Sequence, residues 1–152
     1  MIKVTGSQVG FDLDGSFLVS KLIEGNYPNY RQVIPGEAKE RIALERETLL
    51  RSVSRVSLLA SEKSNSVKMQ FSPGQVEIVA SSPEIGEARE TLAINYKGPE
   101  ITIAFNPEFL MAPLRNLTAD EVHLHLIDEI SPGVLRSGTS FLYVLMPMRV
   151  NN

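Results

Sequence analysis

Two histidines and two acidic residues late in the chain are the side chains best suited to coordinating a metal. His123 and His125 are two apart in a His-Leu-His-Leu stretch, and Asp128 and Glu129 follow. On an extended strand both imidazoles point to one side, so a small metal-dependent hydrolase is one hypothesis. The same alternation is typical of a strand with one face in water, which is the stronger interpretation. The chain has no Gly-x-Ser-x-Gly motif, glycine-rich phosphate loop or cysteine, so we expect no catalytic residue, metal or cofactor.

Basic side chains gather around the first expected helix, and they are Arg51, Arg55, Lys63 and Lys68. A group of this kind is most often a solvated helix face. If the helix lined a concave surface, the same cations could contact DNA phosphates without reading sequence.

Acidic residues alternate with Arg89 further along the chain, at Glu84, Glu87 and Glu90. We expect them on or beside a strand that follows the second hairpin of the main domain. Charges on an edge strand block unwanted pairing or steer a wanted partner. The acidic run is therefore a candidate for contact with a basic protein surface.

Composition predicts one domain with an appendage. The chain has 152 residues, 43% of them hydrophobic, which is enough for one sizeable core. The net charge of −3 argues against a protein coated in positive charge, although a local basic face remains compatible with it. No secretory signal opens the sequence and no window is apolar enough for a membrane span. We therefore expect a cytoplasmic protein without a membrane partner, and the lack of cysteine suits that compartment.

The first 29 residues predict a hairpin and a connector. Alternating apolar residues over 9–13 and an extended pattern over 17–22 flank Asp14-Gly15, a type I′ turn signal. Two strands alone are marginally stable in water, so this hairpin needs a larger sheet. Residues 25–36 are rich in glycine and proline. We therefore expect a boundary that divides the chain into 1–29 and 30–152.

The main domain is predicted to be an internal duplication of a β-α-β-β-β unit. The tripeptide Ser72-Pro73-Gly74 recurs as Ser131-Pro132-Gly133, and the same displacement superposes two strand-to-helix starts. The fold class is therefore α+β, with two helices on one face of antiparallel sheets. In chain order the expected elements are strand 41–46, helix 47–61, strands 66–71, 75–81 and 87–96, strand 100–105, helix 107–117, and strands 120–128, 133–137 and 140–148.

The first expected helix has one apolar arc, formed by Leu49, Val53, Val56, Ser57 and Ala60 with Leu50 at its margin. Leu58 and Leu59 fall outside that arc. Two adjacent leucines off the core face suggest a protein contact, with cover by a local loop as the alternative.

The second expected helix has a well-specified start. Asn106 can cap it, Pro107 suits its first position and Glu108 complements its dipole. Pro113 should kink or shorten this helix, because an interior proline removes a hydrogen bond.

Two segments far apart in the sequence predict a binding surface. The chain ends in Tyr143-Val144-Leu145-Met146-Pro147-Met148-Arg149, where proline marks a strand end or edge and methionine adapts to varied partners. The connector holds Tyr27-Pro28-Asn29-Tyr30-Arg31-Gln32-Val33-Ile34-Pro35. Together with the Phe105-Asn106 junction, these motifs resemble the bacterial DNA sliding clamp, the beta subunit of the replicative DNA polymerase III holoenzyme. The resemblance covers the end of its middle domain and its whole third domain.

This resemblance implies a function. Sliding clamps are noncatalytic processivity factors, in which two three-domain subunits close head to tail into a ring around duplex DNA, without sequence specificity. Their partners are replicative and other DNA polymerases, the clamp loader, and other proteins with clamp-binding peptides. Since the first domain and most of the second have no counterpart here, a C-terminal fragment is expected. The alternative is a stand-alone peptide-binding module that does not encircle DNA.

The resemblance also implies site residues. The peptide groove would comprise Pro28, Val33, Asn106, Phe109, Ile130, Pro132, Val144, Leu145, Met146, Pro147, Met148 and Arg149. Arg51, Arg55 and Lys63 would face DNA, while Leu58, Leu59, Glu84, Glu87 and Glu90 would lie at the subunit interface. Gln32 departs from the family pattern, which often has arginine there, and Pro113 interrupts the second pore-side helix.

Overall fold

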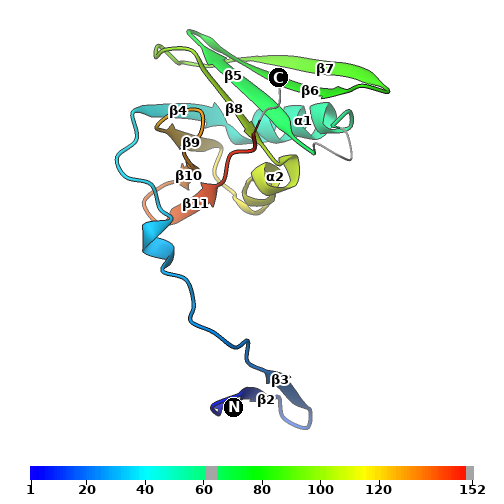
Figure 1. The fold of residues 1–152 in the computed structure, drawn as a ribbon, viewed down its shortest axis with the longest axis vertical. Helices are drawn as coiled ribbons and strands as arrows, with labels where there is room; N and C mark the ends of the chain where they lie inside the picture. Colours follow the sequence, from blue (N-terminus) through cyan, green and yellow to red (C-terminus); the bar gives the residue numbers. More distant parts are fainter. Residues whose placement is uncertain (61–64, 150–152) are drawn as a thin grey trace. The chain divides into compact units, whose positions relative to one another are not determined.

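The computed structural model describes residues 1–60 and 65–149, and the chain forms two compact units, Met1–Tyr30 and Arg31–Asn152 (Figure 1). The division lies one residue after the boundary expected from the sequence.

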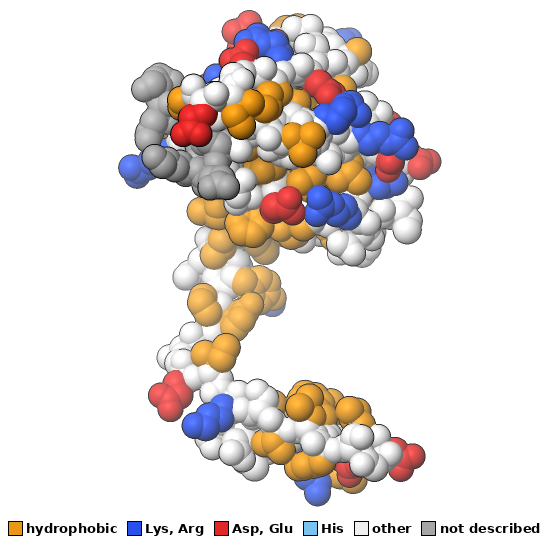
Figure 2. Space-filling model, turned by 90° about the vertical axis from the view of Figure 1, so that its right-hand side faces the viewer, with side chains coloured by type: hydrophobic (Ala, Val, Ile, Leu, Met, Phe, Trp, Pro, Cys, Tyr) orange, Lys and Arg blue, Asp and Glu red, His pale blue; other side chains and the backbone are white. Residues whose placement is uncertain are grey.

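The first unit is a three-stranded antiparallel sheet of β1 (Ile2–Val4), β2 (Gln8–Asp12) and β3 (Phe17–Lys21). The expected hairpin is confirmed as β2 and β3. Asp14 and Gly15 between them both have positive φ, 54° and 102°, as a type I′ turn requires. β1 was missed because its three residues carry no period. Many apolar side chains of this sheet are exposed, among them Phe17 at 66%, and they form the hydrophobic patches of the smaller unit in Figure 2.

The short 3-10 helix η1 (Tyr30–Gln32) lies at the division between the units, and the second unit contains the predicted duplication. Its first half consists of β4 (Glu40–Glu45), α1 (Arg46–Ser57), β5 (Val67–Ser72), β6 (Gln75–Ser82) and β7 (Gly86–Ala93). Its second half consists of β8 (Ile101–Phe105), α2 (Pro107–Asn116), β9 (Glu121–Leu126), β10 (Gly133–Ser137) and β11 (Phe141–Leu145). The order of elements is the one that the repeat predicted.

The two halves exchange their first strands. One sheet has the order β11-β10-β9-β4 and the other β7-β6-β5-β8, so β4 pairs with the second half and β8 with the first (Figure 1). The register brings Leu44 opposite Val122 and Met69 opposite Ile103. The sequence did not predict this exchange, because period and turn signals do not specify the partner of a strand.

Both helices pack against each other and cover the inner faces of the sheets. Strand alternation supplies the core: on β5, Val67, Met69 and Phe71 are buried, while Lys68 and Gln70 between them point to the other face. On α1 the buried residues are Leu49, Ser52, Val53 and Val56, so the predicted arc is confirmed at its centre. Ser57 and Ala60 lie at its margin, half-buried, and Ser52 was missed because serine carries no apolar signal.

Several element boundaries differ from expectation; β7, for example, ends at Ala93 instead of 96, and β9 ends at Leu126 instead of 128. α1 ends at Ser57 instead of 61, since the next amide groups make tighter i to i−3 bonds, such as Leu59 N to Val56 O at 3.1 Å. β11 ends at Leu145 instead of 148. Pro113 was expected to kink or shorten α2, but the helix continues past it to Asn116, one residue short of the expected end, because proline removes a single backbone bond.

Candidate functional site

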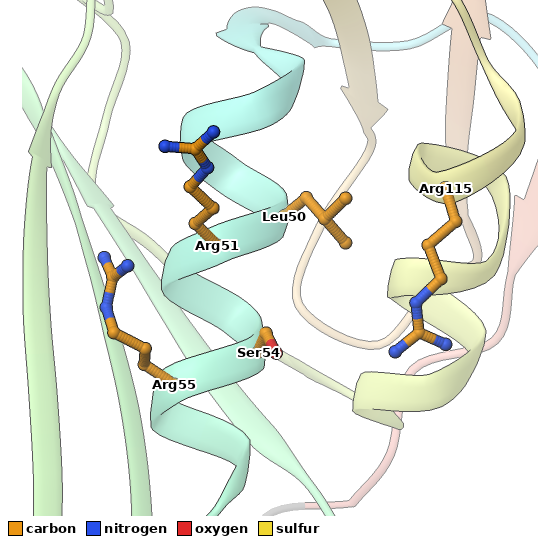
Figure 3. Close-up of a pocket in the computed structure, with 5 residues that line it drawn as sticks. All are labelled: Leu50, Arg51, Ser54, Arg55 and Arg115. Atoms are coloured by element: carbon orange, nitrogen blue, oxygen red, sulfur yellow. The ribbon is translucent and has the colours of Figure 1, made fainter.

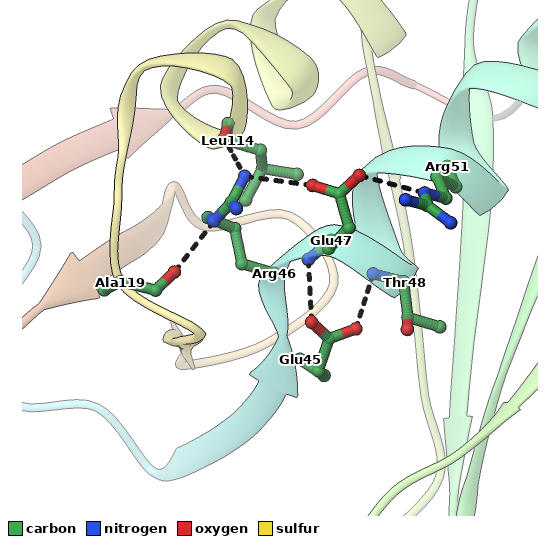
Figure 4. A network of polar contacts seen from close by, with 7 residues as sticks. All are labelled: Glu45, Arg46, Glu47, Thr48, Arg51, Leu114 and Ala119. Atoms are coloured by element: carbon green, nitrogen blue, oxygen red, sulfur yellow. Dashed lines mark hydrogen bonds and ion pairs between the residues drawn. The ribbon is translucent and has the colours of Figure 1, made fainter.

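The start of α1 is held by a carboxylate cap (Figure 4). The Glu45 carboxylate accepts hydrogen bonds from the backbone N–H of Glu47, at 3.1 Å, and of Thr48, at 2.5 Å. These bonds favour the charged carboxylate, so the hydrogen bonds from Thr48 hold the pKa of Glu45 below its usual value. The Glu45 cap was not predicted from the sequence, because glutamate is an uncommon N-cap residue.

Arg46 ties the start of α1 to the second half. Its Nε donates to Ala119 O at 2.8 Å, and its Nη1 donates to Leu114 O at 3.0 Å (Figure 4). The Glu47 carboxylate lies 3.3 Å from Arg46 Nη1 and 2.9 Å from Arg51 Nε. This network fixes the helices relative to each other and orients the first arginine of the helix face.

A hollow of about 330 Å³ lies on the helix face, lined by Leu50, Arg51, Ser54, Arg55 and Arg115. Leu50 and Arg115 approach it from facing helices, whereas Arg51 and Arg55 lie on the side of α1 turned away from α2 (Figure 3). Arg115 was missed in the sequence analysis, which weighed clusters of charge. Its position in the last turn of α2, on the exposed side, was the available signal.

Each arginine around this hollow is paired with a carboxylate. Arg51 Nε lies 2.9 Å from Glu47, and Arg115 Nη1 lies 3.2 Å from Glu108. Arg55 contacts both oxygens of Glu90, at 2.6 and 2.7 Å. The helix face is therefore balanced in charge and does not form a purely basic strip.

One member of the expected basic cluster, Lys68, does not belong to this face. Lys68 alternates with the buried residues of β5 and points to the opposite side of the sheet, so its assignment to the cluster was wrong. Lys63 lies outside the described residues.

The expected acidic run is divided between two faces. Glu84 lies in the turn that joins β6 to β7, Glu87 pairs with Arg89 at 2.7 Å on the outer face, and Glu90 points to the helix side. The division follows from strand geometry, since residues three apart on a strand face opposite sides. The three residues thus lie on or beside β7, as expected, but they do not share one face.

The leucine pair follows the end of α1. Leu58 is 80% exposed and Leu59 is half-buried. Leu58 therefore lies outside the core, as the helical wheel predicted, and is an exposed apolar side chain available for a protein contact.

The terminal segment changes character after β11. Leu145 is buried in the core, Val144 on the opposite face is half-buried, and Met146 is 63% exposed. Pro147 and Met148 are half-buried and Arg149 is exposed. Leu145 therefore anchors the segment, while Met146 is the side chain presented to solvent.

Two contacts place other expected groove residues beside this segment. Met148 N donates to Ala104 O at 2.8 Å, two residues before Asn106, whose Oδ1 caps α2 by accepting from Glu108 N at 2.9 Å. On the other side, Gly133 pairs with Leu145, which brings Pro132 next to the segment. Phe109 on α2 and Ile130 in the 127–132 loop are 62% and 86% exposed.

Asp128 and Glu129, the two acidic residues of the hydrolase hypothesis, hold the 127–132 loop in place through hydrogen bonds. Asp128 Oδ1 accepts from Ile130 N at 3.0 Å and from Ser131 N at 2.6 Å, and the Ser131 hydrogen bonds lower the pKa of Asp128. Glu129 Oε1 accepts from Thr102 N at 3.3 Å. These acids order the loop that presents Ile130.

The two histidines lie on the outer face of β9. His123 Nε2 is 3.2 Å from Glu121, and burial, followed by nearby Arg136 and Arg41, lowers the pKa of His125. Within residues 1–60 and 65–149, no group of three or more metal-ligating side chains could hold a metal ion. No helix in that part of the chain is long and apolar enough to cross a membrane.

The two connector residues expected in the groove belong to different units. Val33 is 47% exposed and follows η1 at the start of the second unit. Pro28 belongs to the first unit.

A duplicated β-α-β-β-β domain with two helices packed together over two antiparallel sheets is the architecture of a DNA clamp domain. Residues 31–149 match the family described as "DNA polymerase III beta subunit, C-terminal domain", and the chain belongs to this family.

Named relatives agree with this assignment. The chain is 34% identical over 146 residues to the "Beta sliding clamp" of Chlamydia muridarum, covering 96% of this chain and 40% of that protein. It is 34% identical over 133 residues to that of Pseudomonas putida, covering 86% and 36%. Among solved structures, a sliding clamp from Bartonella birtlesii bound to griselimycin superposes with a TM-score of 0.90 at 31% identity, covering 98% and 41%. The chain thus spans about 40% of the length of the relatives it matches.

Proposed function

We propose that this chain acts as the C-terminal domain of a sliding clamp, a noncatalytic processivity factor of DNA replication in the bacterial cytoplasm. In the assembled ring it would help to tether DNA polymerase to duplex DNA. The observation that carries the proposal is the exposed Met146 in a terminal segment held between the α2 cap and the 127–132 loop, within a domain of this family.

The terminal segment is proposed as the docking site for clamp-binding peptides of polymerases and the clamp loader. Exposed apolar side chains project from three separate segments, namely Met146, Phe109 and Ile130. Each segment is held by a hydrogen bond, a cap or a turn described above. A surface that is already ordered loses little freedom when a peptide docks, so more of the contact energy appears as affinity. Val33 and Arg149, which belong to the same unit, are proposed to complete the site.

The helix face is proposed to lie toward duplex DNA, with Arg51 and Arg55 contacting phosphates. Such contacts would position the protein without reading the base sequence. Leu58, Leu59, Glu84, Glu87 and Glu90 are proposed to contribute to the head-to-tail subunit interface, where an exposed leucine and an acidic strand would suit an apolar and basic partner surface.

Peptide titration tests the docking site. A fluorescent peptide ending in Leu-Phe would be titrated against the wild-type chain and Met146→Ala. Removing a central apolar anchor should weaken binding by about 2 kcal/mol, or roughly 30-fold in Kd. Ile85→Ala is the matched control, because Ile85 is similarly exposed, at 70%, but lies in the turn between β6 and β7. Equal affinity of wild type and Met146→Ala would contradict the proposed docking site.

A stand-alone peptide-binding module that does not encircle DNA is the second candidate. It is supported by the pairing of Arg51, Arg55 and Arg115 with carboxylates, which leaves the helix face balanced in charge. Salt-sensitive duplex binding that is lost in Arg51→Ala would favour the clamp, and peptide binding without any duplex binding would favour the module.

A further inference from the structure

The pair formed by Arg55 and Glu90 has the geometry of phosphate recognition. Arg55 Nε lies 2.6 Å from Glu90 Oε1, and Arg55 Nη2 lies 2.7 Å from Oε2. Two parallel N–H···O bonds from one edge of a guanidinium are the arrangement that arginine forms with either a carboxylate or a phosphate. The edge of Arg55 that would best hold a DNA phosphate is therefore already filled by Glu90.

The surroundings favour a lasting pair. Glu90 is the more enclosed partner, with 26% of its side chain exposed against 59% for Arg55, and the buried Ser52 hydroxyl lies 3.4 Å from Arg55 Nη2. Arg55 lowers the pKa of Glu90, and Glu90 raises the pKa of Arg55, so both groups stay charged at neutral pH. Since Glu90 stands on β7 and Arg55 on α1, the carboxylate is fixed by a different element from the arginine that it holds.

The other arginines of the hollow are less occupied. Arg51 has one contact to Glu47, through Nε, and that carboxylate is shared with Arg46. Arg115 contacts Glu108 through Nη1 at 3.2 Å, and its Nη2 lies 3.6 Å from Met111 Sδ. Among these three side chains, Arg55 is the one whose guanidinium edge is matched by both oxygens of a single carboxylate.

We propose that Glu90 acts as a built-in competitor of DNA phosphate, so that the duplex must displace the Glu90 carboxylate before Arg55 can contact it. This inference rests on the proposed orientation of the helix face toward DNA. This competition lowers the affinity for duplex DNA, because Arg55 must lose its ion pair with Glu90 for each phosphate contact that it gains. A phosphate that leaves is in turn replaced by Glu90, which keeps the arginine from being left without an anion as the duplex moves past.

The test compares two glutamates that lose the same charge. Glu90→Gln removes the competitor, and Glu77→Gln is the matched control in the same 152-residue chain. Glu77 is similarly enclosed, at 22%, and both of its oxygens lie 3.0 Å from Arg89, but it points to the outer face of the same sheet. Binding of a short fluorescent DNA duplex would be followed by anisotropy over a range of salt concentrations.

The expected result is specific to Glu90. Glu90→Gln should tighten duplex binding several-fold and steepen the slope of log K against log salt, because Arg55 then contacts phosphate without giving up an ion pair. Glu77→Gln should change neither by a comparable amount. In an Arg55→Ala background the effect of Glu90→Gln should disappear, because the competitor then has nothing to occupy.

The outcomes separate this inference from the proposed function. Equal effects of Glu90→Gln and Glu77→Gln, with duplex binding still lost in Arg51→Ala, would overturn the competitor role and leave the DNA-facing surface intact. Absence of duplex binding in both wild type and Glu90→Gln would overturn both. As a second measurement on the wild-type chain, the Arg55 Nε–H resonance should shift when duplex is added and Glu90 is replaced by phosphate. A resonance that stays in place at saturating duplex would contradict the inference.

Discussion

The last strands of the two repeats, β7 and β11, occupy the same position in their sheets and present opposite chemistry. Each is the edge strand of its sheet. β7 exposes Glu87 and Arg89, whereas β11 has half-buried apolar residues and continues into the exposed Met146. Charge on an edge strand discourages pairing with unselected strands, while an apolar edge next to a fixed turn accepts an apolar ligand. The duplication has therefore been specialised, with charge in the first half and apolar contact in the second.

The connections between β5 and β6 and between β9 and β10 also differ in the side chains that they expose. Between β5 and β6 the chain turns within Pro73-Gly74, where Gly74 has a φ of +85°. The corresponding connection between β9 and β10 is longer and is fixed by Asp128, which leaves Ile130 86% exposed. The connection between β9 and β10 thus carries a protruding apolar side chain, Ile130, that the tight turn between β5 and β6 lacks.

The largest expected effect is on the free energy of unfolding, and it tests whether the two halves of the domain unfold independently. Phe105 is fully buried, and its strand β8 belongs to the second half but pairs with the first. Phe105→Ala should lower the free energy of unfolding by about 3–5 kcal/mol. Urea unfolding followed by far-UV circular dichroism and by tyrosine fluorescence should still give a single transition.

Phe17→Ala in the first unit serves as the control, because Phe17 is 66% exposed and should leave that transition almost unchanged. Two resolved transitions in Phe105→Ala would show that the halves unfold independently.

The two helix caps should differ in their response to pH. Asn106 caps α2 with a neutral amide, so Asn106→Ala should cost about 1 kcal/mol at any pH at which the domain is folded. Glu45 caps α1 with a carboxylate whose pKa is lowered from 4.5, so its stabilisation is present above that value and is lost as the pH falls through the folded-state pKa. Thermal melts at neutral and acidic pH should therefore show that the penalty of Glu45→Gln shrinks in acid.

A penalty of Glu45→Gln that is the same in acid would mean that its hydrogen bonds do not depend on charge.

A smaller effect is expected on the outer face of β9, which has no histidine counterpart on β5. Burial, with Arg136, Arg41 and His123 nearby, lowers the pKa of His125 from 6.5. The unfolded chain then takes up a proton more readily, so His125 removes stability as the pH falls below about 6.5. His125→Gln should melt at a higher temperature than wild type in mild acid and at a similar temperature at neutral pH.

A double variant with His123→Gln and His125→Gln should also bind the Leu-Phe peptide with the same affinity as the wild type. Loss of a measurable hydrolytic activity or of bound metal in this double variant would revive the hydrolase hypothesis.

The smallest effect is expected at the exposed leucine that follows α1. Leu58→Ser should change the free energy of unfolding by less than about 0.5 kcal/mol, because Leu58 is 80% exposed. It should also reduce any self-association, measured by sedimentation at increasing concentration. Leu49→Ser, at a fully buried position of the same helix, should instead unfold the domain. A large loss of stability in Leu58→Ser would place this side chain in the core.

Local patterns predicted much of the fold. Residues 133–137 form β10 as expected, and Asn106-Pro107 starts α2, because alternation, capping and turn residues act over short distances. The exchange of β4 and β8 was not predicted, since it depends on which sheet each strand joins. The end of α1 differs from its predicted position because i to i−3 hydrogen bonds replace the regular helical bonds after Ser57.

The candidate sites were predictable as residue types more than as contacts. Met146 was expected to be accessible and is exposed, because a strand that ends at proline leaves its neighbours outside the sheet. The sequence assigned Arg55 and Glu90 to different surfaces, and the structure joins them in one ion pair. That contact spans a helix and a strand of the same half, and no spacing rule along the chain could reveal it.

The exchanged first strands also have a consequence for how such a domain can arise. A polypeptide with one copy of the unit would leave β4 without β9 and keep an open sheet edge. Two identical copies could form a domain-swapped dimer with twofold symmetry, in which the first strand of each copy pairs with the sheet of the other. Joining the copies through the connector at residues 94–100 would make that exchange intramolecular, so its success would no longer depend on protein concentration. The connector between β7 and β8 thus corresponds to the join that would turn such a symmetric dimer into a single chain, after which β7 and β11 could diverge.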